Sequence, residues 1–240
     1  MSRSKSLTAR IDQFINCLKW PAAILAALAT PLLPWSVLLL GWKIASAPWD
    51  SLTLVPFAAG AIGLVVLWRR WLGKNRIGPF LITLEHESTH ALFAILTWHQ
   101  IVGFRASLGR GGEVRFMGKG NWLISVAPYF FPTAALLLFL TAYLLPFPAL
   151  PWQSFLLGVA LGYHLISTYR ETHRDQTDIQ QLGMLFCWLF LPAANLAVVG
   201  FLVSFAYAGS EGLHAWFADV TQPLVTLREW WQEWQAVDEQ

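Results

Sequence analysis

The sequence predicts an all-α integral membrane protein with about six transmembrane helices, and three observations support this fold class. Of the 240 residues, 56% are hydrophobic and only 12% are charged, whereas soluble globular domains have about 25% charged residues. The mean hydropathy is +0.49. Several stretches contain no Asp, Glu, Lys or Arg, and a membrane-spanning helix needs about 20 apolar residues. These stretches are 20–42, 51–68, 120–169 and 179–210.

The apolar stretches are expected to form helices near 20–44, 52–72, 78–98, 121–145, 152–171 and 179–208. The stretch 120–169 is long enough for two spans. The prolines of Leu145–Pro151 divide it, because proline cannot continue a helix. Pro128 and Pro132 are expected to bend the first of these two spans.

The distribution of basic residues predicts a cytoplasmic N-terminus. Basic side chains are dense before the first predicted span and again at 69–76, and the positive-inside rule assigns both regions to the cytoplasm. The first apolar stretch is longer than a signal-peptide core, so it is expected to remain as an anchor. Simple alternation then puts the basic loop 99–119 outside. Either this loop folds back into the membrane, or one predicted span does not cross it.

The chain divides into three predicted regions. Residues 1–76 form a basic segment with two spans, 77–208 form a membrane-embedded core, and 209–240 contain a C-terminal amphipathic helix. That helix, near 212–235, gathers tryptophan and aliphatic side chains near one face and is expected to lie on the membrane surface. Packing against another domain or a second subunit is the alternative.

A β-hairpin is predicted directly after the third helix. Residues 101–107 and 113–117 mix β-forming and charged side chains, and the glycine-rich turn 109–112 separates them. Two other classes of site are excluded. Cys17 and Cys187 are too few for a disulfide framework or a cysteine zinc site. A net charge of +2 without a basic run interleaved with aromatics does not indicate nucleic-acid binding.

The segment His86-Glu87-Ser88-Thr89-His90 carries the chemistry. On a helix, His86 and His90 project from one face within reach of a single metal ion, and Glu87 lies beside them. Two imidazoles hold Zn²⁺ in such sites, and the carboxylate takes a proton from water that the zinc has made acidic. The sequence therefore predicts zinc as cofactor, His86 and His90 as ligands, and Glu87 as the catalytic base.

The position of this motif in an apolar helix supports a functional site. Ionisable groups inside such a helix are costly unless they face an interior site. A buried polar network without metal is the alternative. A zinc site needs a third protein ligand, and the charged segment 169–178 contains the candidates Asp178, Asp175 and His173.

The order of these features resembles the site-2 protease family of intramembrane metalloproteases. The shared features are a His-Glu-x-x-His helix, a hairpin after it, further spans and an aspartate opening a later helix. The segment Gln176–Leu182 is similar to that of compact, divergent members, and it lacks the Asn-Pro-x-x-Asp-Gly pattern of other branches. The resemblance implies that Asp178 is the third zinc ligand. Asp178 is also suited to cap a helix N-terminus.

The resemblance also implies a role for the hairpin in substrate handling. A transmembrane helix must be unwound before hydrolysis, because its carbonyl groups are held in intrahelical hydrogen bonds. An edge strand can bind the unwound segment by strand addition, and Val114 and Phe116 are the expected substrate contacts. A hairpin that lies at the lipid headgroups through its arginines is the alternative.

Together these observations predict a zinc endopeptidase in a lipid bilayer, with a membrane protein as its substrate. A bacterial inner membrane is the expected location. Two alternatives stay open: a zinc hydrolase that acts on a lipid-linked or small amphipathic substrate, and a metal-binding membrane adaptor without enzymatic activity. The oligomeric state and the identity of the substrate are not predicted.

Overall fold

A computed structural model of the chain describes residues 2–46, 54–108, 111–144 and 150–238. The elements in chain order are α1 (Ser2–Cys17), α2 (Lys19–Ala29), α3 (Leu32–Ser46), α4 (Leu54–Arg70), η1 (Leu72–Lys74), α5 (Ile77–Leu96), β1 (Ile101–Ser107), β2 (Gly111–Phe116), α6 (Trp122–Val126), η2 (Ala127–Tyr129), α7 (Thr133–Leu144), α8 (Leu150–Glu171), α9 (Thr177–Leu182) and α10 (Met184–Asp238).

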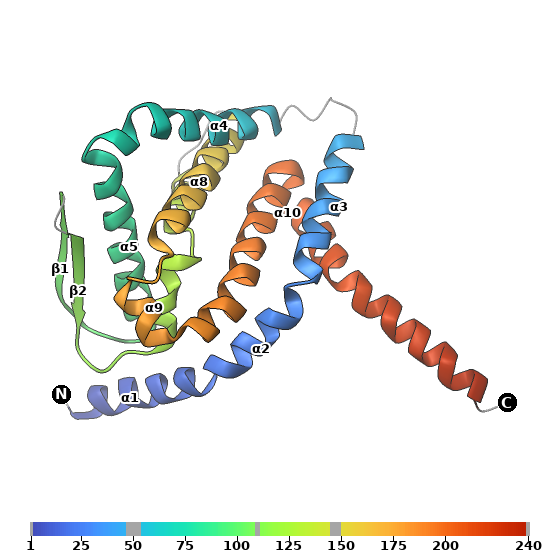
Figure 1. The fold of residues 1–240 in the computed structure, drawn as a ribbon, viewed down its shortest axis with the longest axis horizontal. Helices are drawn as coiled ribbons and strands as arrows, with labels where there is room; N and C mark the ends of the chain where they lie inside the picture. The colour runs from blue at the N-terminus through green and yellow to red at the C-terminus, as the bar shows by residue number, and fades with distance from the viewer. Residues whose placement is uncertain (1, 47–53, 109–110, 145–149, 239–240) are drawn as a thin grey trace.

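The helices form an open frame, and α5, the third predicted helix, is one of its sides (Figure 1). Helix α4 lies across one end of the molecule, and α5 and α8 run from it towards the other end, where α9 begins. Helices α1 and α2 lie along that other end. The hairpin stands beside α5. The last part of α10 projects away from the remainder, after a kink where Ala208 and Gly209 leave the helical conformation.

Close packing of α4 and α8 holds the frame together. A side chain at Gly60 would collide with the Phe155 carbonyl, and one at Gly158 would collide with the Phe57 carbonyl. Small residues at such positions let two helix backbones approach closely. Because α8 ends at Glu171, the packing of α8 against α4 also fixes the position of Glu171 and of the chain that follows it.

Helix α5 is anchored at its start and along its polar face. The Asn75 side chain accepts a hydrogen bond from the Ile77 amide at 2.8 Å, which satisfies one free amide of the first turn. Farther along, the Glu85 carboxylate accepts from the Ala134 amide at 3.0 Å. The Thr89 and Thr133 hydroxyls are 2.5 Å apart. These contacts fix the start of α7 against α5.

The predicted hairpin is confirmed. Strands β1 and β2 pair antiparallel, with Phe104 opposite Val114. The second strand begins at Gly111 and ends at Phe116, close to the predicted 113–117. Residues 109 and 110 of the predicted turn lie outside the described part of the chain.

The predicted number of about six spans is not supported. In the described residues, Leu54–Lys74 and Met184–Gln235 are long and apolar enough to cross a membrane. A third span is possible if the pair Leu7–Ala29 and Leu32–Ser46, bent by 43°, counts as one.

Prolines and polar residues explain this difference. The predicted helix 121–145 is divided into α6, η2 and α7, because Pro128 and Pro132 interrupt its backbone hydrogen bonds. Helix α5 carries Glu85, His86, Glu87 and His90, which lower its apolarity. The predicted break at Leu145–Pro151 lies mostly outside the described residues, which resume at 150.

A buried apolar cluster supports the end of the molecule where α9 lies. It joins α2, α6, η2, α9 and the start of α10 through Ala23, Trp122, Val126, Tyr129, Ile179, Leu182, Phe186, Cys187 and Leu191. These residues come from three parts of the sequence that are far apart, near 23, 122–129 and 179–191. Their burial therefore positions α9 relative to α6.

Candidate metal centre

Helix α5 presents its two histidines and Glu87 to the protein interior. His86, Glu87 and His90 are each only 8% exposed. The Nε2 atoms of His86 and His90 face each other at 3.2 Å, as the spacing of four residues on one helix face predicts. The two imidazoles thus offer a pair of adjacent nitrogen ligands.

Helix α9 brings a carboxylate to the same point. The Asp178 Oδ2 atom lies 3.2 Å from His90 Nε2 and 3.8 Å from His86 Nε2. The other two candidates for the third ligand lie elsewhere: the His173 and Asp175 side chains are 50% and 96% exposed and face each other at 4.0 Å. Of the three candidates, Asp178 is the one that reaches the histidines.

The local structure of α9 explains this placement. Gln176 occupies the N-cap position and Asp178 lies in the first turn of the helix. Ile179 and Leu182, on the other side of the turn, are buried in the apolar cluster described above. With those two side chains turned into the core, the Asp178 carboxylate faces the histidines and not the interior of the cluster.

A hydrogen bond of the other ring nitrogen determines that His90 Nε2 is the nitrogen available to bind a metal. Its Nδ1 atom lies 2.8 Å from the Ile124 carbonyl oxygen. A carbonyl oxygen only accepts, so Nδ1 donates, and a neutral imidazole then keeps its lone pair on Nε2. That lone pair points towards His86 and Asp178. This is the arrangement that metal-ligating histidines adopt.

A second carboxylate stands behind His86. The Glu171 Oε2 atom lies 3.5 Å from His86 Nδ1, and it also accepts a hydrogen bond from the Gln176 side chain at 2.8 Å. His86 Nδ1 itself is buried and has no hydrogen-bond partner among the described residues. A carboxylate in this position is the partner found behind many metal-ligating histidines.

The spacing of the three ligand atoms fits a zinc ion. Zinc bound at about 2.0–2.1 Å with tetrahedral geometry separates its nitrogen and oxygen ligands by about 3.3 Å. The distances between the ligand atoms lie on both sides of this value: 3.2 Å between the two Nε2 atoms, and 3.2 and 3.8 Å from Asp178 Oδ2 to His90 Nε2 and His86 Nε2. Among the described residues, His86, His90 and Asp178 form the group of side chains that can hold a metal ion.

The ionisation of Asp178 suits this role. Burial acts to raise its pKa, but the His86 and His90 side chains, which face its carboxylate, act in the opposite direction and outweigh burial. The pKa of Asp178 is therefore well below its ordinary value. A carboxylate must be deprotonated to bind a metal.

A polar cavity of about 750 Å³ surrounds the group. Glu87 lines it together with the three candidate ligands, and so do Val114 and Phe116, the predicted substrate contacts. The hairpin lies against the site at Gly112, where any side chain would collide with the Glu87 carboxylate. Glycine at this position lets the backbone of β2 lie directly against Glu87.

Several residues that line the cavity or contact its ligands were not identified as site residues from the sequence. Glu171 belongs to the charged segment 169–178, but nothing in that segment pairs it with His86. Asn16 and Lys19 also line the cavity, although they belong to the predicted N-terminal region and not to the predicted core. The Tyr129 hydroxyl lies 3.5 Å from Asp178 Oδ2. Each of these contacts joins residues that are distant in sequence, so no local pattern reveals them.

Replacing Glu171 by alanine is expected to weaken zinc binding by about 10- to 100-fold, because residues behind a metal ligand contribute at that level. Competition with a chromophoric chelator measures the affinity. Glu113→Ala removes an exposed carboxylate that lines the same cavity and is expected to bind zinc like the wild type. Equal affinities for the Glu171→Ala variant and the wild type would show that Glu171 does not support His86.

Comparisons with protein-family models, with curated proteins and with solved structures found no match to this chain. Its function is therefore inferred from the site itself.

Proposed function

We propose that this protein is an intramembrane zinc metallopeptidase that hydrolyses a peptide bond of a membrane protein. One observation carries the proposal: two histidines of α5 and an aspartate of α9 converge in one cavity, and Glu87 lines the same cavity. A catalytic zinc site has three protein ligands and leaves the fourth coordination position open, whereas a structural zinc site has four protein ligands.

Each residue of the site has a defined role in this proposal. His86, His90 and Asp178 would hold the ion. A bound zinc ion supplies Lewis acidity, which polarises a carbonyl group and makes water reactive near neutral pH. Glu87 accepts the proton of the attacking water and then donates it to the nitrogen of the leaving amine. The carboxylate returns to its ionised form, and one peptide bond has been exchanged for an amine and a carboxylic acid.

The hairpin supports a peptide as substrate. Strand β2 pairs with β1 along one edge, and Gly112, Val114 and Phe116 of β2 line the cavity. An extended peptide that adds to the other edge of β2 would lie along the metal centre, with its side chains alternating between the two faces of the sheet. This mode of binding requires an unwound segment, which is the form in which a transmembrane substrate exposes its carbonyl groups.

The membrane location has separate support. Within the described part of the chain, two helices are long and apolar enough to cross a bilayer, or three if the bent pair is one span. The basic N-terminal segment favours a cytoplasmic N-terminus. A bacterial inner membrane is the location we propose. The exposed Trp230, Trp231 and Trp234 of the projecting part of α10 suit a position at the membrane surface.

Removal and return of zinc test the proposal. Purified protein is expected to contain stoichiometric zinc, measured by atomic spectroscopy. When it is added to detergent-solubilised membranes from cells that lack it, mass spectrometry of peptide N-termini is expected to detect new termini inside apolar segments. These termini should disappear after chelation and reappear when zinc is restored. Protein that binds no zinc, or zinc-loaded protein that generates no new termini, would contradict the proposal.

A further inference from the structure

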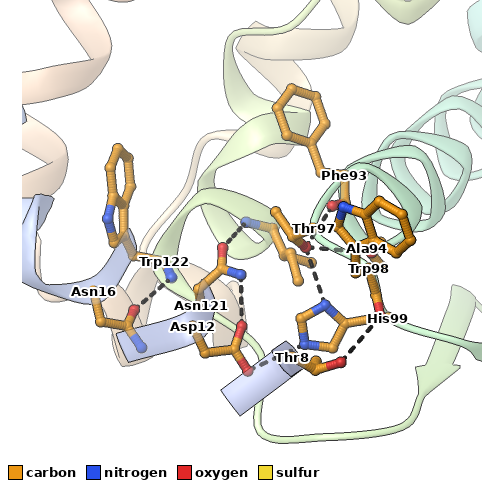
Figure 2. A network of polar contacts seen from close by, with 11 residues as sticks. Thr8, Asp12, Asn16, Phe93, Ala94, Thr97, Trp98, His99, Asn121 and Trp122 are labelled. Carbon is orange, nitrogen blue, oxygen red and sulfur yellow. Dashed lines mark hydrogen bonds and ion pairs between the residues drawn. The ribbon is translucent and has the colours of Figure 1, made fainter. Parts of the chain in front are cut away.

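Helix α1 is joined to the end of α5 and to α6 by a buried polar network (Figure 2). At its centre, the Asp12 carboxylate lies between two side chains from the segment that follows α5. Its Oδ2 atom is 3.2 Å from His99 Nε2, and its Oδ1 atom accepts a hydrogen bond from the Asn121 amide at 2.8 Å. The His99 and Asp12 side chains are 0% and 9% exposed. Both oxygens of a buried carboxylate are thus engaged.

His99 is held from its other side by the last turn of α5. The Thr97 hydroxyl donates to the Phe93 carbonyl at 2.7 Å, and its oxygen lies 3.0 Å from His99 Nδ1. The imidazole ring therefore has a partner at each nitrogen and cannot turn without losing one. A buried polar group left without its partner costs about 1–3 kcal/mol. This cost holds Asp12, and therefore helix α1, in place against His99.

Asn121 passes this restraint to α6. It is the N-cap residue of that helix, and its side-chain oxygen accepts a hydrogen bond from the Ile124 amide at 3.3 Å. The same side chain donates to Asp12 through its amide group. One asparagine thus uses both halves of its amide, one to begin α6 and the other to attach α6 to α1.

Ile124 completes the connection to the metal centre. Its amide is held by Asn121, and its carbonyl oxygen accepts from His90 Nδ1. A continuous chain of hydrogen bonds therefore runs from Asp12 through Asn121 and Ile124 to His90. Asn16 adds a parallel contact, because its side-chain oxygen accepts from the Trp122 amide at 3.1 Å.

We propose that α1 positions the metal ligand His90, with Asp12 and Asn121 as the positioning residues. This proposal rests on the proposed function and deepens it, because it couples the placement of the N-terminal helix to the affinity of the catalytic metal. Asp12 orients Asn121, Asn121 sets the first turn of α6, and that turn presents the carbonyl that fixes the orientation of the His90 ring. Displacement of α1 from His99 and Asn121 would release the orientation of the His90 ring and weaken metal binding.

Zinc affinity of the full-length protein tests the proposal. Asp12→Ala and Asn121→Ala are each expected to weaken zinc binding by about 10-fold, the lower end of the effect of residues behind a metal ligand. The visible absorption of bound Co²⁺, which depends on coordination geometry, should shift in both variants. Lys43→Ala breaks the ion pair between Lys43 and Asp219, which joins α3 to α10, and is expected to leave affinity and absorption unchanged.

An exchange of the two side chains separates positioning from a general loss of folding. Asn121→Asp alone places two carboxylates against each other and should weaken zinc binding like the alanine variants. In the double variant Asp12→Asn/Asn121→Asp, the amide at position 12 donates to the carboxylate at position 121, which still caps α6. The exchange is therefore expected to restore most of the wild-type zinc affinity and the wild-type Co²⁺ absorption.

The possible outcomes distinguish this proposal from the proposed function. If wild-type protein binds zinc and both alanine variants bind it equally well with unchanged Co²⁺ absorption, α1 does not position His90, and the peptidase proposal stands. If the double variant binds zinc as weakly as the single variants, the chain of hydrogen bonds from Asp12 through Asn121 to His90 does not position His90. If the wild-type protein binds no zinc, the proposed function fails, and the positioning role fails with it.

Discussion

Replacing Glu87 by glutamine is expected to abolish peptide hydrolysis while the zinc stays bound. Glutamine has nearly the same shape, but its amide cannot take a proton from water, and general acid–base catalysis contributes about 10²- to 10⁴-fold to the rate. Glu87 is outside the group of His86, His90 and Asp178, so the ligands remain. The rate is measured from the appearance of new peptide termini, and zinc content is measured on the same preparation.

Glu85→Gln is the matched control for this variant. Glu85 lies two positions away on α5, and its carboxylate accepts a hydrogen bond from the Ala134 amide. Glutamine keeps an oxygen for that bond, so cleavage close to the wild-type rate is expected. Full activity of zinc-loaded Glu87→Gln protein would remove Glu87 from the catalytic role. If neither the wild type nor the variant cleaves any peptide although both bind zinc, the peptidase proposal would be wrong, and a zinc hydrolase of lipid-linked or small amphipathic substrates and a metal-binding adaptor would remain.

Asp178→Ala is expected to remove most of the bound zinc. The substitution leaves two histidines without the third ligand, and the loss should exceed the roughly 100-fold upper effect of residues behind a ligand. Peptide cleavage should fall with zinc occupancy. Zinc content after dialysis and the affinity from chelator competition measure the effect.

Asp175→Ala and His173→Ala are the controls for this prediction. Both residues belong to the same charged segment as Asp178, yet their side chains are half-exposed or fully exposed and lie apart from His86 and His90. Wild-type zinc content is expected for both variants. Normal zinc affinity in Asp178→Ala, with a loss in either control, would transfer the ligand role to Asp175 or His173.

The sequence predicted the elements that depend on local order. The spacing of His86 and His90 on a helix is enough to bring their Nε2 atoms to 3.2 Å, because helical periodicity does not depend on the remainder of the chain. The hairpin after α5 follows from β-forming residues around a glycine-rich turn. The bend at Pro128 and Pro132 is likewise local, although it divides the predicted helix into three elements and does not merely curve it.

The number of membrane spans was predicted incorrectly for a physical reason. Counting apolar stretches treats each as an independent helix, whereas a polar face lowers the apolarity of α5 and prolines shorten the helices after Asn121. The predicted end of the last span near residue 208 is confirmed by the kink at Ala208 and Gly209, and the helix predicted near 212–235 follows this kink and continues to Asp238.

The sequence by itself was enough to identify the two histidines and the glutamate between them as site residues. It was also enough to predict the hairpin beside them and the apolar character of the chain. Tertiary structure decided which acidic residue faces the histidines, because burial of Ile179 and Leu182 turns Asp178 towards them. It also decided that Glu171 stands behind His86 and that Asp12 reaches Asn121. These pairs are separated by many residues, and only the packing of α1, α6, α8 and α9 around α5 brings them into contact.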